Sequence, residues 1–97
     1  MDIDLLFVAG CPNRQLMRRN LDAALVEVGI DATIHEREVR SAGDAARWGM
    51  HGSPTLLVDG RDPFGNAEAT VSCRLYRDAA GVHGAPSVAQ LRAVLAT

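Results

Sequence analysis

The sequence predicts one α/β domain with helices on both faces of a mixed sheet, and three observations lead to that prediction. The chain of 97 residues is long enough for one domain with one modest core. In the first half, apolar residues recur alternately at the spacing of strands and at that of helices. The second half adds two strand-like segments and a last helix. Residues 1–97 are therefore expected to form a single domain of order βαβαββα with a four-stranded sheet.

The first half begins with a strand and a helix. Residues 3–9 form a continuous apolar run once the flanking Asp2 and Asp4 are passed, which is typical of a strand buried on both faces. Residues 13–28 place apolar side chains along one helical face, and Gly29 follows as a stop signal. Residues 32–39 alternate between apolar and polar side chains, which indicates a second, less buried strand.

A short helix is expected next, over residues 42–48. Ser41 stands at its start as an N-cap, and Asp44 occupies the position of a capping box. A compact strand then begins at Pro54 and ends at the turn signal of Asp59 and Gly60.

The remainder of the chain is expected to contain a loop, a strand and a helix. Residues 60–70 are rich in Gly, Asp, Pro and Asn, and their one aromatic residue is available for burial or for a partner. Residues 71–77 alternate as a strand, and a glycine-rich stretch follows at 81–84. Ser87 and Gln90 form a second capping box at the start of the last helix.

Composition and charge exclude some classes of function. The net charge of −2 argues against general nucleic-acid binding, which needs a basic face. The first residues lack the basic segment of a signal peptide, and the first apolar run is too short for a membrane span. We therefore expect a cytoplasmic protein without a membrane partner. All ten basic residues are Arg, which, with the many alanines, suggests a GC-rich bacterial genome.

Two segments carry a resemblance to a known family. The first is Phe7-Val8-Ala9-Gly10-Cys11-Pro12-Asn13-Arg14, in which a buried strand leads into Cys-Pro and a helix. The second is residues 48–60, Trp48-Gly49-Met50-His51-Gly52-Ser53-Pro54-Thr55-Leu56-Leu57-Val58-Asp59-Gly60, in which a short helix leads to proline, threonine, three aliphatic residues and a glycine turn. Together they resemble the thioredoxin-like family, here as a small bacterial protein with Cys-Pro-x-Arg in place of the usual Cys-x-x-Cys. The specific motifs are confined to these two segments, while the order of elements agrees over nearly the whole chain.

The resemblance implies a fold and a site. Pro54 would be cis and face Cys11, with Pro12, Ser53 and Pro54 forming the substrate-binding surface. The backbone of Ser53 would pair with an extended peptide or a thiol cofactor. Arg14 stands where thioredoxins have their second cysteine, so a two-cysteine cycle within the motif is excluded.

Cys11 is the candidate nucleophile on physical grounds as well. Pro12 suits the first position of a helix, which would make Cys11 the N-cap. A thiolate there would accept hydrogen bonds from free amides and would be stabilised by the helix dipole. Arg14 would add a positive charge. The competing interpretation is that Arg14 and Arg18 are solvated, with Arg18 paired to Asp22.

These residues predict a monothiol oxidoreductase in which Cys11 attacks a disulfide and an external thiol resolves the adduct. No cofactor is expected beyond a low-molecular-weight thiol as co-substrate, and the partner would be a disulfide-containing protein or a small thiol. One alternative is a non-catalytic module that binds an extended peptide beside Pro54. Another is capture of a soft metal or an organomercurial by the thiolate.

The second cysteine and the histidines are assigned structural roles. Cys73 is expected in a strand antiparallel to that beginning at Pro54, buried and beyond disulfide reach of Cys11. A resolving role for Cys73 remains the minority alternative, because the preceding loop leaves the register open. His51 is expected at the surface in a tight turn, although it could line the site. His35 and His83 complete no metal-ligand spacing, and no structural zinc is expected.

Overall fold

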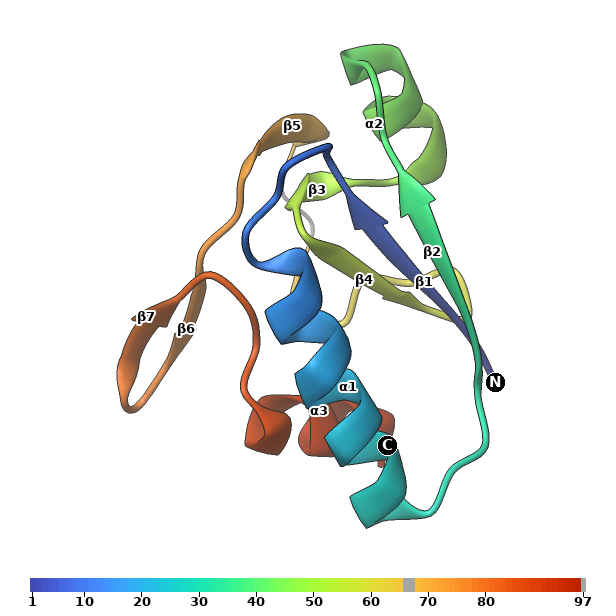
Figure 1. The fold of residues 1–97 in the computed structure, drawn as a ribbon, viewed down its shortest axis with the longest axis vertical. Coiled ribbons are helices and arrows are strands. Elements are labelled where there is room, and N and C mark those ends of the chain that lie inside the picture. Colours follow the sequence, from blue (N-terminus) through green and yellow to red (C-terminus); the bar gives the residue numbers. More distant parts are fainter. Residues whose placement is uncertain (66–67, 97) are drawn as a thin grey trace.

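The computed structural model describes residues 1–65 and 68–96, which form a mixed α/β domain with three helices among the described residues (Figure 1). The elements run in the order β1 (Asp2–Phe7), α1 (Arg14–Val28), β2 (Thr33–Glu38), α2 (Ala42–Trp48), β3 (His51–Ser53), β4 (Thr55–Val58), β5 (Thr70–Cys73), β6 (Tyr76–Asp78), β7 (Gly81–His83) and α3 (Val88–Leu95). None of the helices in these ranges is long and apolar enough to cross a bilayer.

The main sheet is mixed and has β1 at its centre. Its order is β2-β1-β4, with β1 parallel to β2 and antiparallel to β4. Leu5 of β1 lies between Glu36 of β2 and Leu56 of β4. The sequence predicts four strands, whereas the described part of this sheet has three. The fourth is missing because the segment after the long loop pairs with β3 instead.

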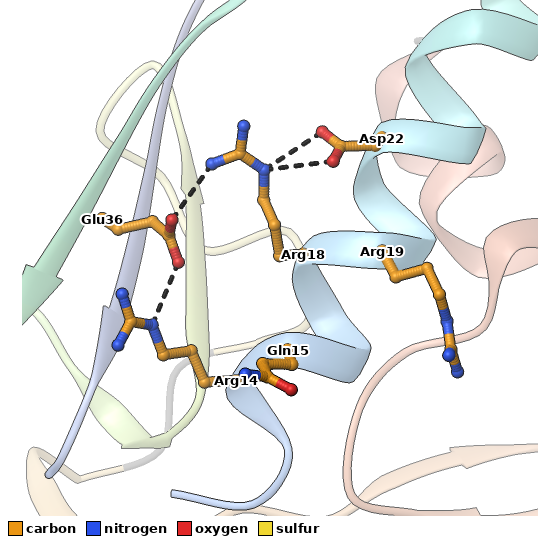
Figure 2. Close-up of a pocket in the computed structure, with 6 residues that line it drawn as sticks. All are labelled: Arg14, Gln15, Arg18, Arg19, Asp22 and Glu36. Atoms are coloured by element: carbon orange, nitrogen blue, oxygen red, sulfur yellow. Dashed lines mark hydrogen bonds and ion pairs between the residues drawn. The ribbon is translucent and has the colours of Figure 1, made fainter.

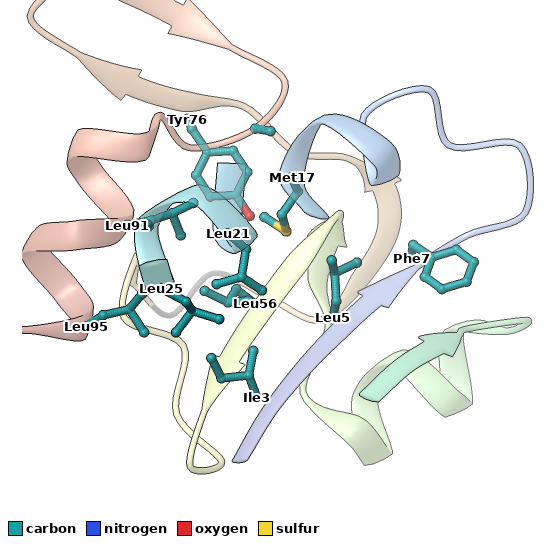
Figure 3. Close-up of a cluster of buried hydrophobic side chains, with 12 residues drawn as sticks. Ile3, Leu5, Phe7, Met17, Leu21, Leu25, Leu56, Tyr76, Leu91 and Leu95 are labelled. Carbon is teal, nitrogen blue, oxygen red and sulfur yellow. The ribbon is translucent and has the colours of Figure 1, made fainter. Parts of the chain in front are cut away.

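Alternation along β1 divides the core between the two faces of the sheet. Ile3, Leu5 and Phe7 point to one face and pack with α1, α3 and Leu56 (Figure 3). Leu6 points to the other face, in a smaller apolar cluster that includes residues of α2 and Met50. Helices therefore cover both faces, as the sequence predicts.

Local signals in the sequence fix several boundaries. Gly29 ends α1 with φ of 69°, in the left-handed conformation typical of a helix stop. The Ser41 hydroxyl accepts a hydrogen bond from the Asp44 amide at the start of α2. At α3, the capping box of Ser87 and Gln90 is complete. The helix stop at Gly29, the N-cap at Ser41 and the capping box of α3 are therefore confirmed, while the Asp44 carboxylate pairs with Arg47.

The turn at the end of β4 is also confirmed. Asp59 and Gly60 both have positive φ, at 49° and 84°, as a type I′ hairpin turn requires. The Val58 and Arg61 backbones exchange hydrogen bonds of 2.7 and 3.1 Å across this turn.

The prediction of a single strand over residues 71–77 is wrong. The chain instead forms β5, which runs parallel to β3, and then β6, which forms a hairpin with β7. Gly52 makes the β3–β5 pairing possible, because a Cβ at Gly52 would lie 2.8 Å from the Cβ of Arg74. The predicted glycine-rich loop at 81–84 contains β7, and the hairpin extends from the body of the fold (Figure 1).

Candidate functional site

The chain reaches Cys11 through a tight turn at the end of β1. The amide of Cys11 donates to the Val8 carbonyl at 3.1 Å. Gly10 has φ of 74° at the third position of this turn, where a type II turn favours glycine. The turn holds Cys11 half-buried beside the larger core cluster.

Cys11 lines an open pocket of about 400 Å³. Pro12 and Arg14 also line it, so the pocket contains three of the predicted site residues. The remaining walls come from the end of β1, the turn, and the side chains of Gln15 and Glu38. The sulfur therefore borders a space open to small molecules.

Cys11 is not the N-cap of α1, contrary to the sequence-based prediction. The N-cap is Asn13, and α1 begins at Arg14, two residues later than the first helical position predicted for Pro12. Pro12 and Asn13 form a further turn, across which the Arg14 amide approaches the Cys11 carbonyl at 3.4 Å. The Asn13 side chain makes no cap hydrogen bond and packs closely against Gly84. Tertiary packing at this point moves the start of the helix.

Arg14 lines the cysteine pocket, but its charge is already partnered. Its Nε donates to Glu36 Oε1 at 3.1 Å, and its guanidinium lies 3.8 Å from the centre of the Phe7 ring. Arg18 bridges Glu36 and Asp22, at 3.2 and 3.1 Å (Figure 2). The Arg18–Asp22 pair predicted from sequence is thus confirmed, and Glu36 is an additional partner that neither helical spacing nor charge pattern identified.

These charged residues form a second surface pocket next to the first. It measures about 480 Å³ and is lined by Arg14, Gln15, Arg18, Arg19, Asp22 and Glu36. Arg14 and Gln15 line both pockets, so the two are contiguous. Arg19 points away from the Glu36 cluster (Figure 2).

The Ser53–Pro54 peptide bond is cis, as the resemblance implies. Ser53 is buried, and its Oγ accepts a hydrogen bond from the Val8 amide at 3.0 Å. Val8 is also the first residue of the turn that carries Cys11. The backbone before Pro54 and the loop of Cys11 are therefore joined through one residue.

Tyr76 is hydrogen-bonded to Pro54. Its buried hydroxyl donates to the Pro54 carbonyl at 2.5 Å. Burial is the main cause that raises the pKa of Tyr76 above its ordinary value. Arg74 lowers that pKa, while Asp62 and Cys11 add smaller rises. The phenol is thus a neutral donor to the carbonyl of the cis-proline.

Cys73 lies in a position that the sequence-based register did not predict. It is exposed rather than buried, and it ends β5, where it pairs with Ser53 of β3. The prediction failed because β5 pairs with β3 and not with β4, so Cys73 comes next to the residue before Pro54. Both cysteines are free.

A buried charged cluster supports this region from behind, and sequence reasoning did not find it. The Asp62 side chain is fully buried and accepts from Arg74 Nη1 at 2.5 Å and from the Phe64 amide at 2.8 Å. His51 Nδ1 lies 2.9 Å from Asp62 Oδ2, with the His51 side chain 16% exposed. His51 is therefore a partly buried partner of Asp62, not the surface residue predicted. Phe64 is partly buried and packs edge-on against Tyr76, with centroids 5.3 Å apart.

No signal of local spacing would have revealed this cluster, because His51, Asp62 and Arg74 come from β3, the loop after β4 and the residue after β5. Within residues 1–65 and 68–96, no group of three or more His, Cys, Asp or Glu side chains is arranged to hold a metal ion. Comparison with protein-family models, with curated proteins and with solved structures finds no match to this chain.

Proposed function

We propose that this chain is a thioredoxin-like protein that carries out thiol–disulfide exchange through Cys11. The observation that carries the proposal is the position of the sulfur. Cys11 is half-buried at the rim of an open pocket, and its loop is joined through Val8 to the residue before the cis-proline. A partly exposed thiol in such a place is accessible to a disulfide and shielded on one side.

The architecture supports the resemblance. A central strand with one parallel and one antiparallel neighbour, helices on both faces and a cis Ser53–Pro54 bond agree with the fold that the two motifs imply. The three-stranded sheet and the β6–β7 hairpin are departures from the expected pattern. The proposal of a thioredoxin-like fold thus depends most on the segments around Cys11 and Pro54.

In the proposed reaction, the Cys11 thiolate attacks one sulfur of a disulfide in a protein or a small molecule. A mixed disulfide forms on Cys11, and the second substrate sulfur leaves as a thiolate that takes up the proton lost by Cys11. A second thiol then attacks the mixed disulfide and restores Cys11. Arg14, fixed by Glu36 at the rim of the pocket, contributes positive charge near the reacting sulfurs. The expected compartment is the cytoplasm, where low-molecular-weight thiols serve as co-substrates.

Two variants with one cysteine each provide the test. We expect Cys73→Ser, which keeps Cys11, to react with glutathione disulfide faster than Cys11→Ser, which keeps the exposed Cys73. If the reaction rate depended on exposure alone, Cys73 would react faster, because Cys11 is the less exposed thiol. Mass spectrometry of the adduct over time gives both rates, and an equal or slower reaction at Cys11 would overturn the proposal.

The charge of Arg14 is tested separately. Arg14→Gln should lower the reaction rate of Cys11 with this anionic disulfide, and added salt should reduce the difference. Arg92→Gln is the matched control, since Arg92 of α3 is a half-exposed arginine paired to Glu27, and neither residue lines the two pockets beside Cys11.

The peptide-binding alternative has less support. The backbone of Ser53 was expected to pair with an incoming peptide, but its carbonyl accepts from the Arg74 amide at 3.0 Å. A strand of the same chain therefore occupies this edge, and a peptide would have to displace β5.

A further inference from the structure

The occupied edge beside Pro54 brings the second cysteine of the chain into the site. Cys73 is the residue of β5 that pairs with Ser53. Ser53 in turn holds the Val8 amide at 3.0 Å, and Val8 accepts from the Cys11 amide at 3.1 Å. The strand pairing and the two hydrogen bonds thus connect Cys73 to Cys11 through Ser53 and Val8.

The side chain of Cys73 leaves β5 on the same face as that of Val71, because side chains two residues apart on a strand share a face. Arg74 points inward to Asp62, with its side chain 10% exposed. Paired residues of parallel strands share a face, so Cys73 lies on the face where the Ser53 hydroxyl meets Val8. This is the side on which the turn to Cys11 begins.

The surroundings of β5 agree with this placement. Val71 of β5 lines one pocket together with Val8 and Ala9, so β5 borders the turn between β1 and α1 (Figure 1). Three of the four residues of β5 are exposed, and its register with β3 is irregular between His51 and Ser53. Most of β5 is therefore exposed, and its pairing with β3 is interrupted before Cys73.

We propose that Cys73 is the internal resolving thiol for Cys11. This inference rests on the proposed exchange chemistry and supplies its second thiol, in place of an external one. After Cys11 has formed a mixed disulfide with a low-molecular-weight disulfide, the Cys73 thiolate attacks the Cys11 sulfur. The Cys11–Cys73 bond forms, the bond to the adduct breaks, and the adduct leaves as a thiolate that takes up the proton from Cys73.

The substrate is reduced to two thiols as the two cysteines are oxidised to one disulfide. A disulfide requires the two Cα atoms to come within about 7 Å of each other. The proposal requires the exposed end of β5 to move Cys73 to this distance while Arg74 stays paired to Asp62. External thiol then reduces the internal disulfide and completes the cycle.

The test treats the full chain and the Cys73→Ser variant with glutathione disulfide and follows intact mass over time. The wild type should pass through a transient adduct and end about 2 Da below its reduced mass, as one disulfide requires. The Cys73→Ser variant should retain the adduct on Cys11, with release at least about tenfold slower, because it lacks a thiol tethered nearby. Trypsin should leave residues 1–14 joined to residues 62–74 in the oxidised wild type only.

The outcomes separate the two proposals. If the wild type keeps a stable adduct for as long as Cys73→Ser, the resolving role of Cys73 is overturned while exchange at Cys11 stands. If neither protein forms an adduct on Cys11, the exchange function itself fails. Far-ultraviolet circular dichroism controls for folding, and Cys73→Ala should behave as Cys73→Ser does, because the side chain is exposed.

Discussion

Replacing Asp62 with asparagine is expected to remove at least about 3 kcal/mol from the free energy of unfolding. The Asp62 carboxylate is fully buried and binds both Arg74, at 2.5 Å, and His51, at 2.9 Å. The introduced amide would keep the size of the side chain but lose its charge, and the NH₂ group would face the donors of Arg74. Because the Arg74 side chain is only 10% exposed, water would compensate little of the lost pairing. Removing one partner of such a buried pair costs about 3–5 kcal/mol.

Urea unfolding followed by the fluorescence of Trp48, the only tryptophan, measures this loss. With a denaturant dependence of about 1.5 kcal/mol per molar urea, a loss of about 3 kcal/mol lowers the midpoint by about 2 M. Glu27→Gln is the control, because Glu27 pairs with Arg92 at 3.6 Å and both side chains are 49% exposed. That variant should lose no more than about 0.5 kcal/mol. A midpoint shift for Asp62→Asn as small as that of the control would refute the structural role assigned to the buried cluster.

Three further predictions concern the backbone at Gly52, the phenol of Tyr76 and the N-cap of α3. Gly52→Ala should lower the free energy of unfolding by about 2 kcal/mol or more, because φ of Gly52 is 103° and the added Cβ would collide with Arg74. The control is Gly29→Ala, where φ is also positive but the surrounding space is open, and the loss should be only about 1 kcal/mol. Burial raises the pKa of Tyr76, so its contribution to stability is complete below the ordinary tyrosine pKa of about 10 and declines as pH rises through the higher folded value. Urea midpoints measured across this alkaline range should fall for the wild type more than for Tyr76→Phe, in a chain with no lysine to titrate there. Ser87→Ala should cost about 1 kcal/mol in thermal unfolding through loss of the α3 cap.

Each of these predictions has a clear contrary result. Equal losses for the two glycine variants would show that the approach of Arg74 is not restrictive. Identical alkaline profiles for the wild type and the phenylalanine variant would exclude the linkage of Tyr76 ionisation to unfolding. An unchanged melting temperature for Ser87→Ala would mean that packing alone holds the start of α3.

Part of the candidate site could be predicted because its signals are local. A buried strand that runs into Cys-Pro placed Cys11 at the end of β1, and the Ser53-Pro54-Thr55 segment indicated the cis bond. The N-cap assignment of Cys11 failed, because the chain makes two turns before α1 begins at Arg14. Whether a helix starts at a proline or two residues later depends on contacts with other elements, such as the packing of Asn13 against Gly84.

Local signals in the chain were enough to specify the mixed α/β class and several boundaries: the limits of α2, the end of α1, the capping box of α3 and the turn after β4. These features could be predicted because side-chain periodicity, capping hydroxyls and glycines act within a few residues. Long-range contacts were needed to establish that β5 pairs with β3, which exposes Cys73 beside Ser53. They were also needed to bring Asp62, His51 and Arg74 together in the interior. Strand partners and buried ion pairs join residues far apart in the chain, and the free energy that selects them comes from burial and pairing that no short segment contains.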